Sequence, residues 1–346
     1  MKKITWKLTT CLMAALLLCM PVLTGCDKPE EEPETTLDEV SEGTAEETTE
    51  ETTKPEDTIE ASKGLAFVSN GDGTCCVSRI GKCTDTDVVI PIVSPDGDIV
   101  TVISNSAFFG CTNLTSITIP ASVTSIETGA FSDCTGLTSI TIPDSVTSIG
   151  EFTFSHCSNL TSITIPDSVT SIGEGAFAYC SNLTSMVVEV GNQTYHSDGN
   201  CVIKTKSKTL IAGCQSSVIP DDGSVTSIGY DAFFGCTGLT SITIPDSVTS
   251  IGDLAFDGCT GLTTITIPDS VTSMPTFSLC SNLTSITIPD SVTSIGNSAF
   301  FGCAALTDVH YSGTKDQWRA IENRGDNNSL STATIHCTDG DITPEP

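Results

Sequence analysis

Apolar and polar residues alternate in a fourteen-residue stretch, LTSITIPDSVTSIG, that begins at Leu137. Ile140 and Ile142 are separated by the polar Thr141, and all three side chains are β-branched. A period of two places successive side chains on opposite faces of a strand, and β-branched residues favour strands. The pattern therefore predicts a short strand with one buried face and one outward face.

The residues that follow predict where this strand ends. Pro143 cannot donate to a strand ladder, and Asp144 and Ser145 have turn chemistry. Residues 146–149 form a second short apolar-polar piece, which Gly150 interrupts. One copy of the stretch thus predicts two short extended segments joined by a turn.

The stretch recurs letter for letter at Leu160, Leu239 and Leu283. Cysteines follow the same period: Cys111, Cys134, Cys157 and Cys180 are each 23 residues apart, and a phenylalanine stands three residues before each. A repeat of this length with an L-x-x-I-x-I strand is typical of a leucine-rich-repeat solenoid. We expect parallel strands stacked at a 23-residue period, short helical or turn corners, and one continuous core of Phe, Cys, Leu and Ile.

The consensus LTSITIPDSVTSIGxxAFxxC, which covers about residues 80–312, resembles the BspA-like bacterial surface leucine-rich repeats. The resemblance implies a protein that is exported, attached to the cell surface and active in adhesion to host or neighbouring-cell proteins. No single residue of the chain carries that implication.

The chain begins with a lysine-containing segment, an apolar run too short to span a membrane, and LTGC at residues 23–26. This order resembles a bacterial lipoprotein signal, which implies a signal peptide over 1–25 and lipidation at Cys26. Residues 26–63 then form an acidic linker without aromatic residues, which we expect to be disordered.

Three further segments complete the predicted organisation. Residues 64–106 are expected to hold an N-terminal β-hairpin cap and the first coil, and residues 107–312 the solenoid, with an inserted hairpin at about 189–216. Residues 313–346 are expected to hold a C-terminal cap and tail. There Thr314 and Gln317 have the spacing of a capping box, and SLSTATIHC predicts a last strand.

Composition narrows the classes of function. The formal net charge is −29, which excludes a nucleic-acid binder and leaves the lipid as the only membrane contact. The sequence shows no converging acid, base and nucleophile and no Gly-rich phosphate loop, so we expect neither an enzyme nor a cofactor. No metal site is expected either. The four histidines are scattered, and the Asp after each repeat proline fits a turn better than a calcium ligand.

The cysteine ladder has two interpretations. Stacked coils lie about 4.8 Å apart, which is compatible with disulfides between neighbours. Cysteine is also a small apolar residue that packs well in cores, and we expect buried free thiols. Outside the ladder, Cys201 and Cys214 are candidates for a bridge across the inserted hairpin.

The outward side chains of the predicted strands are the candidate binding residues. Stacking turns them into a polar, uncharged ladder on a sheet that we expect to be concave, suited to many weak contacts with a long partner. The ladder comprises Ser116, Thr118, Ser139, Thr141, Ser162, Thr164, Ser241, Thr243, Thr264, Thr266, Ser285 and Thr287.

We predict a monomeric, lipid-anchored protein of the bacterial cell surface that binds an extracellular protein or polymer. Three alternatives stay open. The chain could be a structural surface spacer without a dedicated ligand. The working surface could also lie on the insertion near Tyr195 and His196, or on the variable convex corners of the coils.

Overall fold

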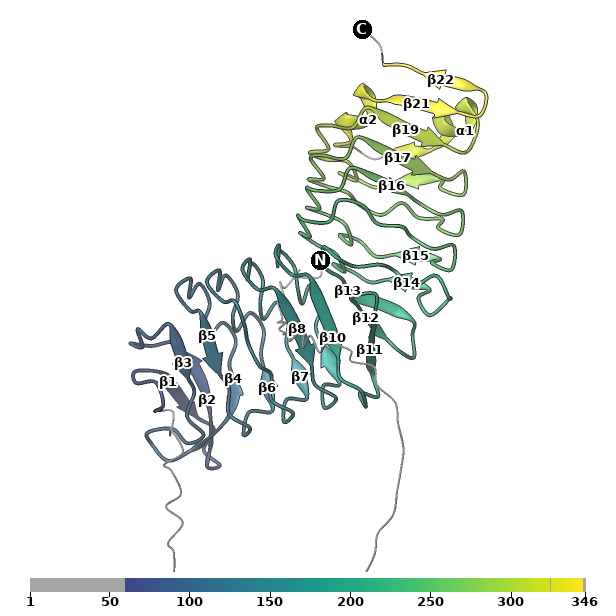
Figure 1. The fold of residues 1–346 in the computed structure, drawn as a ribbon. Helices are drawn as coiled ribbons and strands as arrows, with labels where there is room; N and C mark the ends of the chain where they lie inside the picture. The colour runs from purple at the N-terminus through teal and green to yellow at the C-terminus, as the bar shows by residue number, and fades with distance from the viewer. Residues whose placement is uncertain (1–59, 324, 345–346) are drawn as a thin grey trace, which may run out of the picture. The chain divides into compact units, whose positions relative to one another are not determined.

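The computed structural model describes residues 60–323 and 325–344, and these wind into a solenoid of short strands and turns (Figure 1). The predicted signal peptide, Cys26 and nearly all of the acidic linker lie outside the described residues. Each coil contributes up to two short strands, which stack in parallel on the same positions of the next coil. None of the helices in the described ranges is long and apolar enough to span a membrane.

The first stack, here called the LTSITI ladder, is built from the predicted L-x-x-I-x-I strands. Its pairs run parallel and in register, as in Ser162 beside Ser185 and Ser285 beside Thr264. Its strands are β3 (Asp87–Val89), β5 (Ser116–Thr118), β8 (Ser162–Ile165), β10 (Ser185–Val188), β16 (Thr264–Thr266), β17 (Ser285–Ile288), β19 (Asp308–Tyr311) and β21 (Thr334–Cys337).

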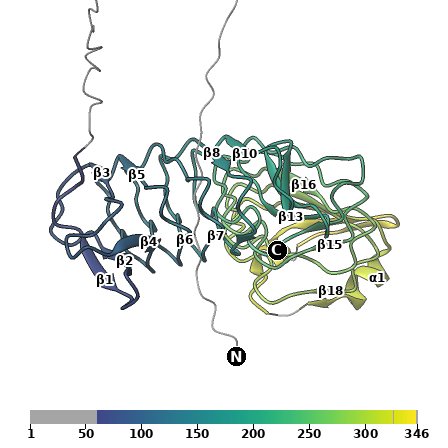
Figure 2. The same ribbon diagram turned by 90° about the horizontal axis from the view of Figure 1, so that it is seen from below.

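The second stack, here called the VTSI ladder, uses the short segment after the Pro-Asp turn. Ser148 pairs in parallel with Ser125 on one side and Ser171 on the other. Figure 2 shows β3, β5, β8 and β10 along one edge of the coils and β4, β6 and β7 along the other. The strands are β4 (Ile99–Ile103), β6 (Ser125–Ile126), β7 (Ser148–Ile149), β9 (Ser171–Ile172), β14 (Ser227–Ile228), β15 (Ser250–Ile251), β18 (Ser294–Ile295) and β20 (Glu322–Asn323).

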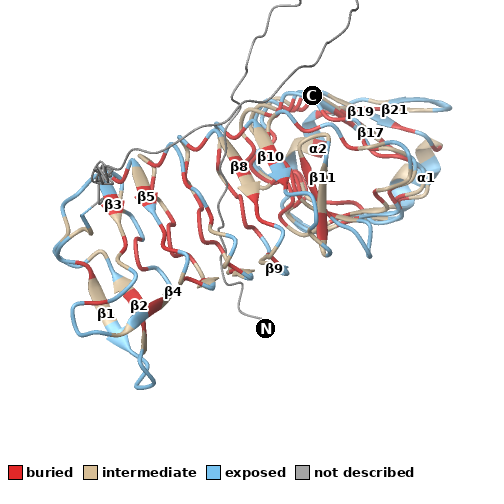
Figure 3. Cartoon of the chain, turned by 60° about the horizontal axis from the view of Figure 1, so that its bottom comes forward, coloured by how far each residue is buried: buried red, intermediate tan, exposed pale blue. Residues whose placement is uncertain are grey.

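The four identical copies do not all form the same strand. The copies at Leu160 and Leu283 form β8 and β17, whereas residues 139–142 are not a strand and Ser241 makes only a bridge to Thr264. Ile140 and Ile142 are nevertheless buried. The expectation of a strand in every coil is therefore wrong, although the alternation of buried and outward residues is confirmed (Figure 3).

Stacked phenylalanine rings form the centre of the core. Phe131 lies between Phe108 and Phe154, with ring centroids 5.1 Å and 4.6 Å away. After the insertion the stack resumes with Phe233, Phe256, Phe277 and Phe300. All seven rings are fully buried. One coil cannot cover such a ring, so each coil depends on its neighbours for its apolar burial.

The corners around these rings are turns, and within the described residues the coils contain no helix. Two backbone positions in the left-handed region flank the ring, as Gly129 (φ 62°) and Asp133 (φ 58°) flank Phe131. Non-glycine residues at such positions cost conformational energy. The expected short corners are thus turns, and their left-handed geometry accounts for the frequent Gly, Ser and Asp there.

The ladder cysteines are free thiols, and all but the half-buried Cys111 are buried, which confirms the prediction. Each buried thiol donates to a main-chain oxygen of the preceding coil, as Cys157 Sγ does to Phe131 O at 3.3 Å. Burial raises the pKa of Cys180 and Cys303 to about 12, so these thiols stay protonated at neutral pH. The predicted Cys201–Cys214 bridge is wrong, because both residues are free and buried.

The insertion contains three strands, β11 (Tyr195–Asp198), β12 (Cys201–Lys204) and β13 (Thr209–Ala212), in antiparallel order. Strand β13 then pairs in parallel with β14 and restarts the VTSI ladder. Both faces of β12 are buried: Val202 belongs to one core cluster, while Cys201 and Ile203 belong to the other. The insertion therefore lies between two sections of the core.

Both ends of the solenoid carry the predicted elements. A hairpin of β1 (Ala66–Ser69) and β2 (Thr74–Arg79) precedes the coils, and β2 pairs in parallel with β4. At the other end, helix α1 (Lys315–Ala320) begins with the predicted capping box, and Trp318 packs against the core.

The last predicted strand is only partly correct. Residues 328–332 form helix α2 (Asn328–Thr332), whose Leu330 is buried, and only the following residues form β21. Strand β22 (Gly340–Ile342) then pairs antiparallel with β21. A helix covers an open core end more completely than a further strand, which explains the difference.

Candidate functional site

All twelve predicted binding residues lie on the outward side of the LTSITI coil segments, and each is exposed or half-buried. Parallel register places outward residues of neighbouring coils side by side. Thr287 of β17 lies between Thr266 of β16 and His310 of β19. The structure thus brings the predicted residues together as rows, in two sections separated by the insertion.

Other hydroxyl groups of the repeat have a structural role that sequence reasoning missed. In one coil, Thr138 donates to Thr115 O at 3.3 Å, Ser145 to Val123 O at 2.6 Å, and Thr147 to Thr124 O at 3.3 Å. Each bond joins a side chain to the main chain of the preceding coil. A net stabilisation of about 1 kcal/mol per bond is typical. The same bonds recur for Thr184, Thr263, Thr284, Thr307, Thr124, Thr170, Thr249, Ser168, Ser247, Ser270 and Ser291.

The outward threonines differ from these hydroxyl groups. Their side chains have no hydrogen-bond partner among the residues that the structure describes. A hydroxyl group offers one donor and two acceptor sites. The threonines concerned are Thr118, Thr141, Thr164, Thr243, Thr266 and Thr287. One set of hydroxyls in each coil thus holds the coils together, and a second set is available to a partner.

A shallow hollow of about 620 Å³ lies on the first section of this surface. Five of the predicted residues line it: Ser116, Thr118, Ser139, Thr141 and Thr164. Two carboxylates, Asp144 and Glu189, stand at its edge. The hollow coincides with the coil at 139–142 that is not a strand, where the ladder opens.

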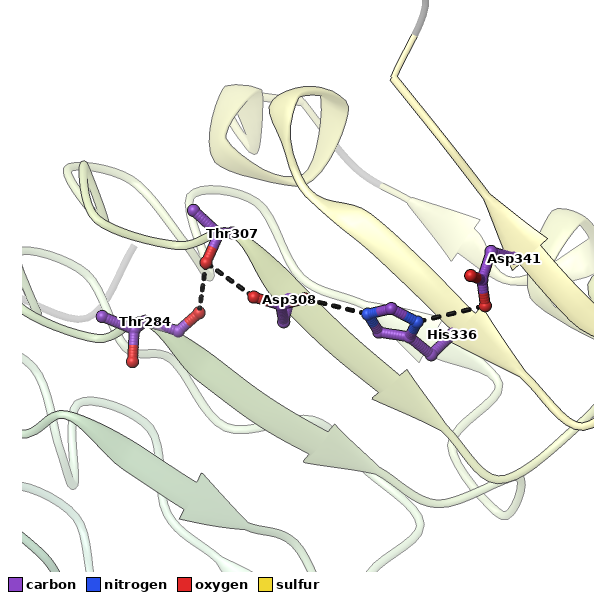
Figure 4. Close-up of polar contacts among 5 residues, drawn as sticks. All are labelled: Thr284, Thr307, Asp308, His336 and Asp341. Carbon is purple, nitrogen blue, oxygen red and sulfur yellow. Dashed lines mark hydrogen bonds and ion pairs between the residues drawn. The ribbon is translucent and has the colours of Figure 1, made fainter.

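Charged residues replace serine and threonine at the far end of the ladder (Figure 4). His336 lies between two carboxylates, with Nε2 2.9 Å from Asp308 Oδ1 and Nδ1 3.1 Å from Asp341 Oδ1. These hydrogen bonds raise the pKa of His336, and the His336 contact lowers the pKa of Asp308. Sequence reasoning missed this cluster, because Asp308, His336 and Asp341 are not close together in the sequence. Its only signal was Asp308 and His310 at the Ser and Thr positions of the repeat.

The described parts of the chain hold no group of three or more His, Cys, Asp or Glu side chains arranged to bind a metal ion. The Asp residues that follow the repeat prolines are exposed turn residues. The insertion offers less binding surface than its sequence suggests. Tyr195 is buried, and its hydroxyl accepts a hydrogen bond from Ile172 N–H at 3.0 Å.

Asp231 is a buried carboxylate two residues before Phe233. Only 5% of its surface is exposed, and Oδ1 has no hydrogen-bond partner among the described residues. Burial, together with the neighbouring carboxylates of Glu174 and Asp257, raises the pKa of Asp231 to about 7. The charged form of Asp231 therefore destabilises the fold.

We expect Asp231→Asn to alter how stability depends on pH. The folded-state pKa of about 7 lies above the ordinary value of 3.8. Protonation of Asp231 therefore favours the folded state. This contribution to stability is fully present below the ordinary pKa of 3.8 and is lost as pH rises through the folded-state pKa of about 7. Asp231→Asn should therefore be more stable than the wild type above neutral pH. The variant should also lack the fall in stability with rising pH that Asp231 causes. Urea unfolding midpoints across pH measure this difference.

The exposed Asp253 provides the control for this experiment. Asp253→Asn removes one negative charge from the same part of the fold but no buried carboxylate, so it should not give the gain in stability above neutral pH that Asp231→Asn gives. Parallel profiles for the wild type and Asp231→Asn would contradict the prediction.

The family described as "BspA type Leucine rich repeat region" matches residues 101–221 and 204–321, in 6 copies. No match is found among curated proteins.

Three solved structures are similar to the chain. A leucine rich cell surface protein from Faecalibacterium prausnitzii is 26% identical, over 77% of this chain and 98% of that one, with a TM-score of 0.43. A leucine-rich repeat protein from Eubacterium ventriosum is 25% identical, over 72% and 83%, with a TM-score of 0.49. One from Bacteroides ovatus is 29% identical, over 74% and 71%, with a TM-score of 0.45.

Proposed function

Because the chain belongs to the BspA-type leucine-rich repeat family, we propose that it is a binding protein of a bacterial cell surface. The partner is an extracellular protein or polymer, held on the outward face of the LTSITI ladder. The observation that carries the proposal is the division of hydroxyls. The side chains of the six outward threonines of the LTSITI segments have no hydrogen-bond partner within the described chain, whereas other repeat hydroxyls bond to the preceding coil.

The chemistry of the ladder favours a long partner. Nearly identical hydroxyls repeat at about 4.8 Å along a parallel sheet, so an extended chain meets the same group at each step. Each contact is weak, and many contacts on one partner give strength through multivalency. The carboxylates beside the hollow and the net charge of −29 disfavour a strongly acidic partner.

We expect the triple variant Thr141→Arg, Thr164→Arg and Thr243→Arg to lose its affinity for the partner. The three large cations occupy the ladder without removing a hydrogen bond of the fold. The measurement is a binding screen of the full chain against extracellular-matrix proteins, glycan polymers and neighbouring cells, followed by titration of each binder.

A second triple variant controls for charge. Ser171→Arg, Ser250→Arg and Ser273→Arg add the same charge at exposed residues of the VTSI segments, and binding should persist. Equal binding by both triple variants would refute the ladder as the working surface. Absence of any binder in the screen would favour a structural spacer.

The proposed anchor is a lipid on Cys26 of the LTGC box. We expect Cys26→Ala to shift the protein from the membrane fraction to the medium, or to leave it unprocessed, because acylation requires the thiol. Cys19→Ala changes a cysteine of the apolar run and should leave the anchor intact. Detergent phase partitioning measures both, and a membrane-bound Cys26→Ala protein would refute the anchor.

A further inference from the structure

A second hollow, of about 290 Å³, lies at the corners of the coils and shares no residue with the LTSITI ladder. It is lined by residues of three consecutive coils, around the turns that flank Phe108, Phe131 and Phe154. The proposed function does not account for it.

Aromatic rings border this hollow. The side chain of Phe109 is 60% exposed, although large apolar residues are usually buried. His156 also lines the hollow, and its ring stacks on Tyr179 with centroids 4.4 Å apart. Tyr179 does not line the hollow and in turn lies close to Gly235, where a Cβ would come within 2.4 Å of the ring. Stacked rings thus occur directly beside this hollow.

Polar groups line the rest of the hollow. Ser155 is fully buried, and its Oγ has no hydrogen-bond partner within the described residues. An unpaired buried hydroxyl is costly, which makes it a sign of a missing partner. Ser106, Ser132 and the carboxylate of Asp133 also line the hollow, with Ser132 Oγ 3.4 Å from Asp133 Oδ2.

We propose that this hollow binds a neutral hexose unit of a glycan. A hexose has apolar C–H faces that pack on aromatic rings and hydroxyls that both donate and accept. Few polar groups beside aromatic surface are typical of sites for small molecules. Asp133 and the net charge of −29 disfavour sialic and uronic acids, whose carboxylates would be repelled.

The test is saturation-transfer NMR of the full chain with millimolar glucose, galactose and N-acetylglucosamine. We expect transfer from the protein to at least one sugar. Phe109→Ala and Ser155→Ala should each lower the affinity for that sugar about tenfold. This is the loss typical of a removed stacking or hydrogen-bonding group. Phe301→Ala removes an equally exposed ring, 54% exposed, from a distant coil and should have no effect.

Two results would overturn the proposal: no transfer to any of these sugars, or unchanged affinity in Phe109→Ala. Melting curves check that the variants fold. The arginine variant of the ladder should bind the hexose normally, so failure of this proposal and failure of the ladder proposal are distinguishable.

Discussion

Phe131→Ala is expected to lower the free energy of unfolding by about 3–5 kcal/mol. The ring is fully buried and is stacked on both sides, at 5.1 Å from Phe108 and 4.6 Å from Phe154. Its removal leaves a cavity that two neighbouring coils border, and the hydrogen bonds between coils limit how far these coils can close it. Urea unfolding followed by circular dichroism measures the loss.

Phe109→Ala is the matched control for this prediction. Phe109 belongs to the adjacent coil and is 60% exposed, so its removal should change stability by no more than about 0.5 kcal/mol. A loss below about 1 kcal/mol for Phe131→Ala would show that the coils collapse onto the cavity and that the ring stack is not the main source of cohesion.

Gly213→Ala is expected to destabilise the protein by about 3 kcal/mol, at the upper end for overpacking. Gly213 lies in the inserted coil at the position equivalent to the core phenylalanine of the other coils. Its N–H donates to Ala232 O at 2.8 Å, and its carbonyl accepts the Cys236 thiol at 3.6 Å. A Cβ on Gly213 would lie 2.0 Å from Cε1 of the fully buried Phe233. Because the ring is fully buried, it can move away from the added methyl group only if its neighbours also move.

Gly296→Ala is the control for the backbone effect of replacing a glycine. A Cβ at Gly296 meets no atom within 4 Å, and the expected change is neutral or a gain of about 0.5 kcal/mol. Equal midpoints for the two variants would show that the core around Phe233 adapts to the added methyl group.

The structure also divides the roles of side chains that look alike in the sequence. Thr138 and Thr141 belong to the same LTSITI segment, yet only the side chain of Thr138 bonds to the preceding coil. A binding surface can therefore change at the outward threonines without loss of cohesion between coils.

The repeat period, the buried face of each segment and the Phe and Cys rows could all be predicted from the sequence. Each is a local or periodic property: alternation sets the face of Ile140 and Ile142, and the 23-residue period sets which residues stack. The capping box at Thr314 and Gln317 is local in the same sense, and the structure contains it. The outward position of the twelve predicted ladder residues follows from the same alternation.

Only the tertiary structure decided how identical segments differ. The copies at Leu137 and Leu160 have the same letters, but only the second forms a strand, because a strand requires hydrogen bonds from neighbouring coils and β10 supplies them to β8. The hollow at Thr141, the free thiols of Cys201 and Cys214, and the position of Gly213 against Phe233 are likewise set by residues far away in the chain. A repeated sequence carries the same local information in each copy, whereas packing and hydrogen bonding depend on what lies on either side.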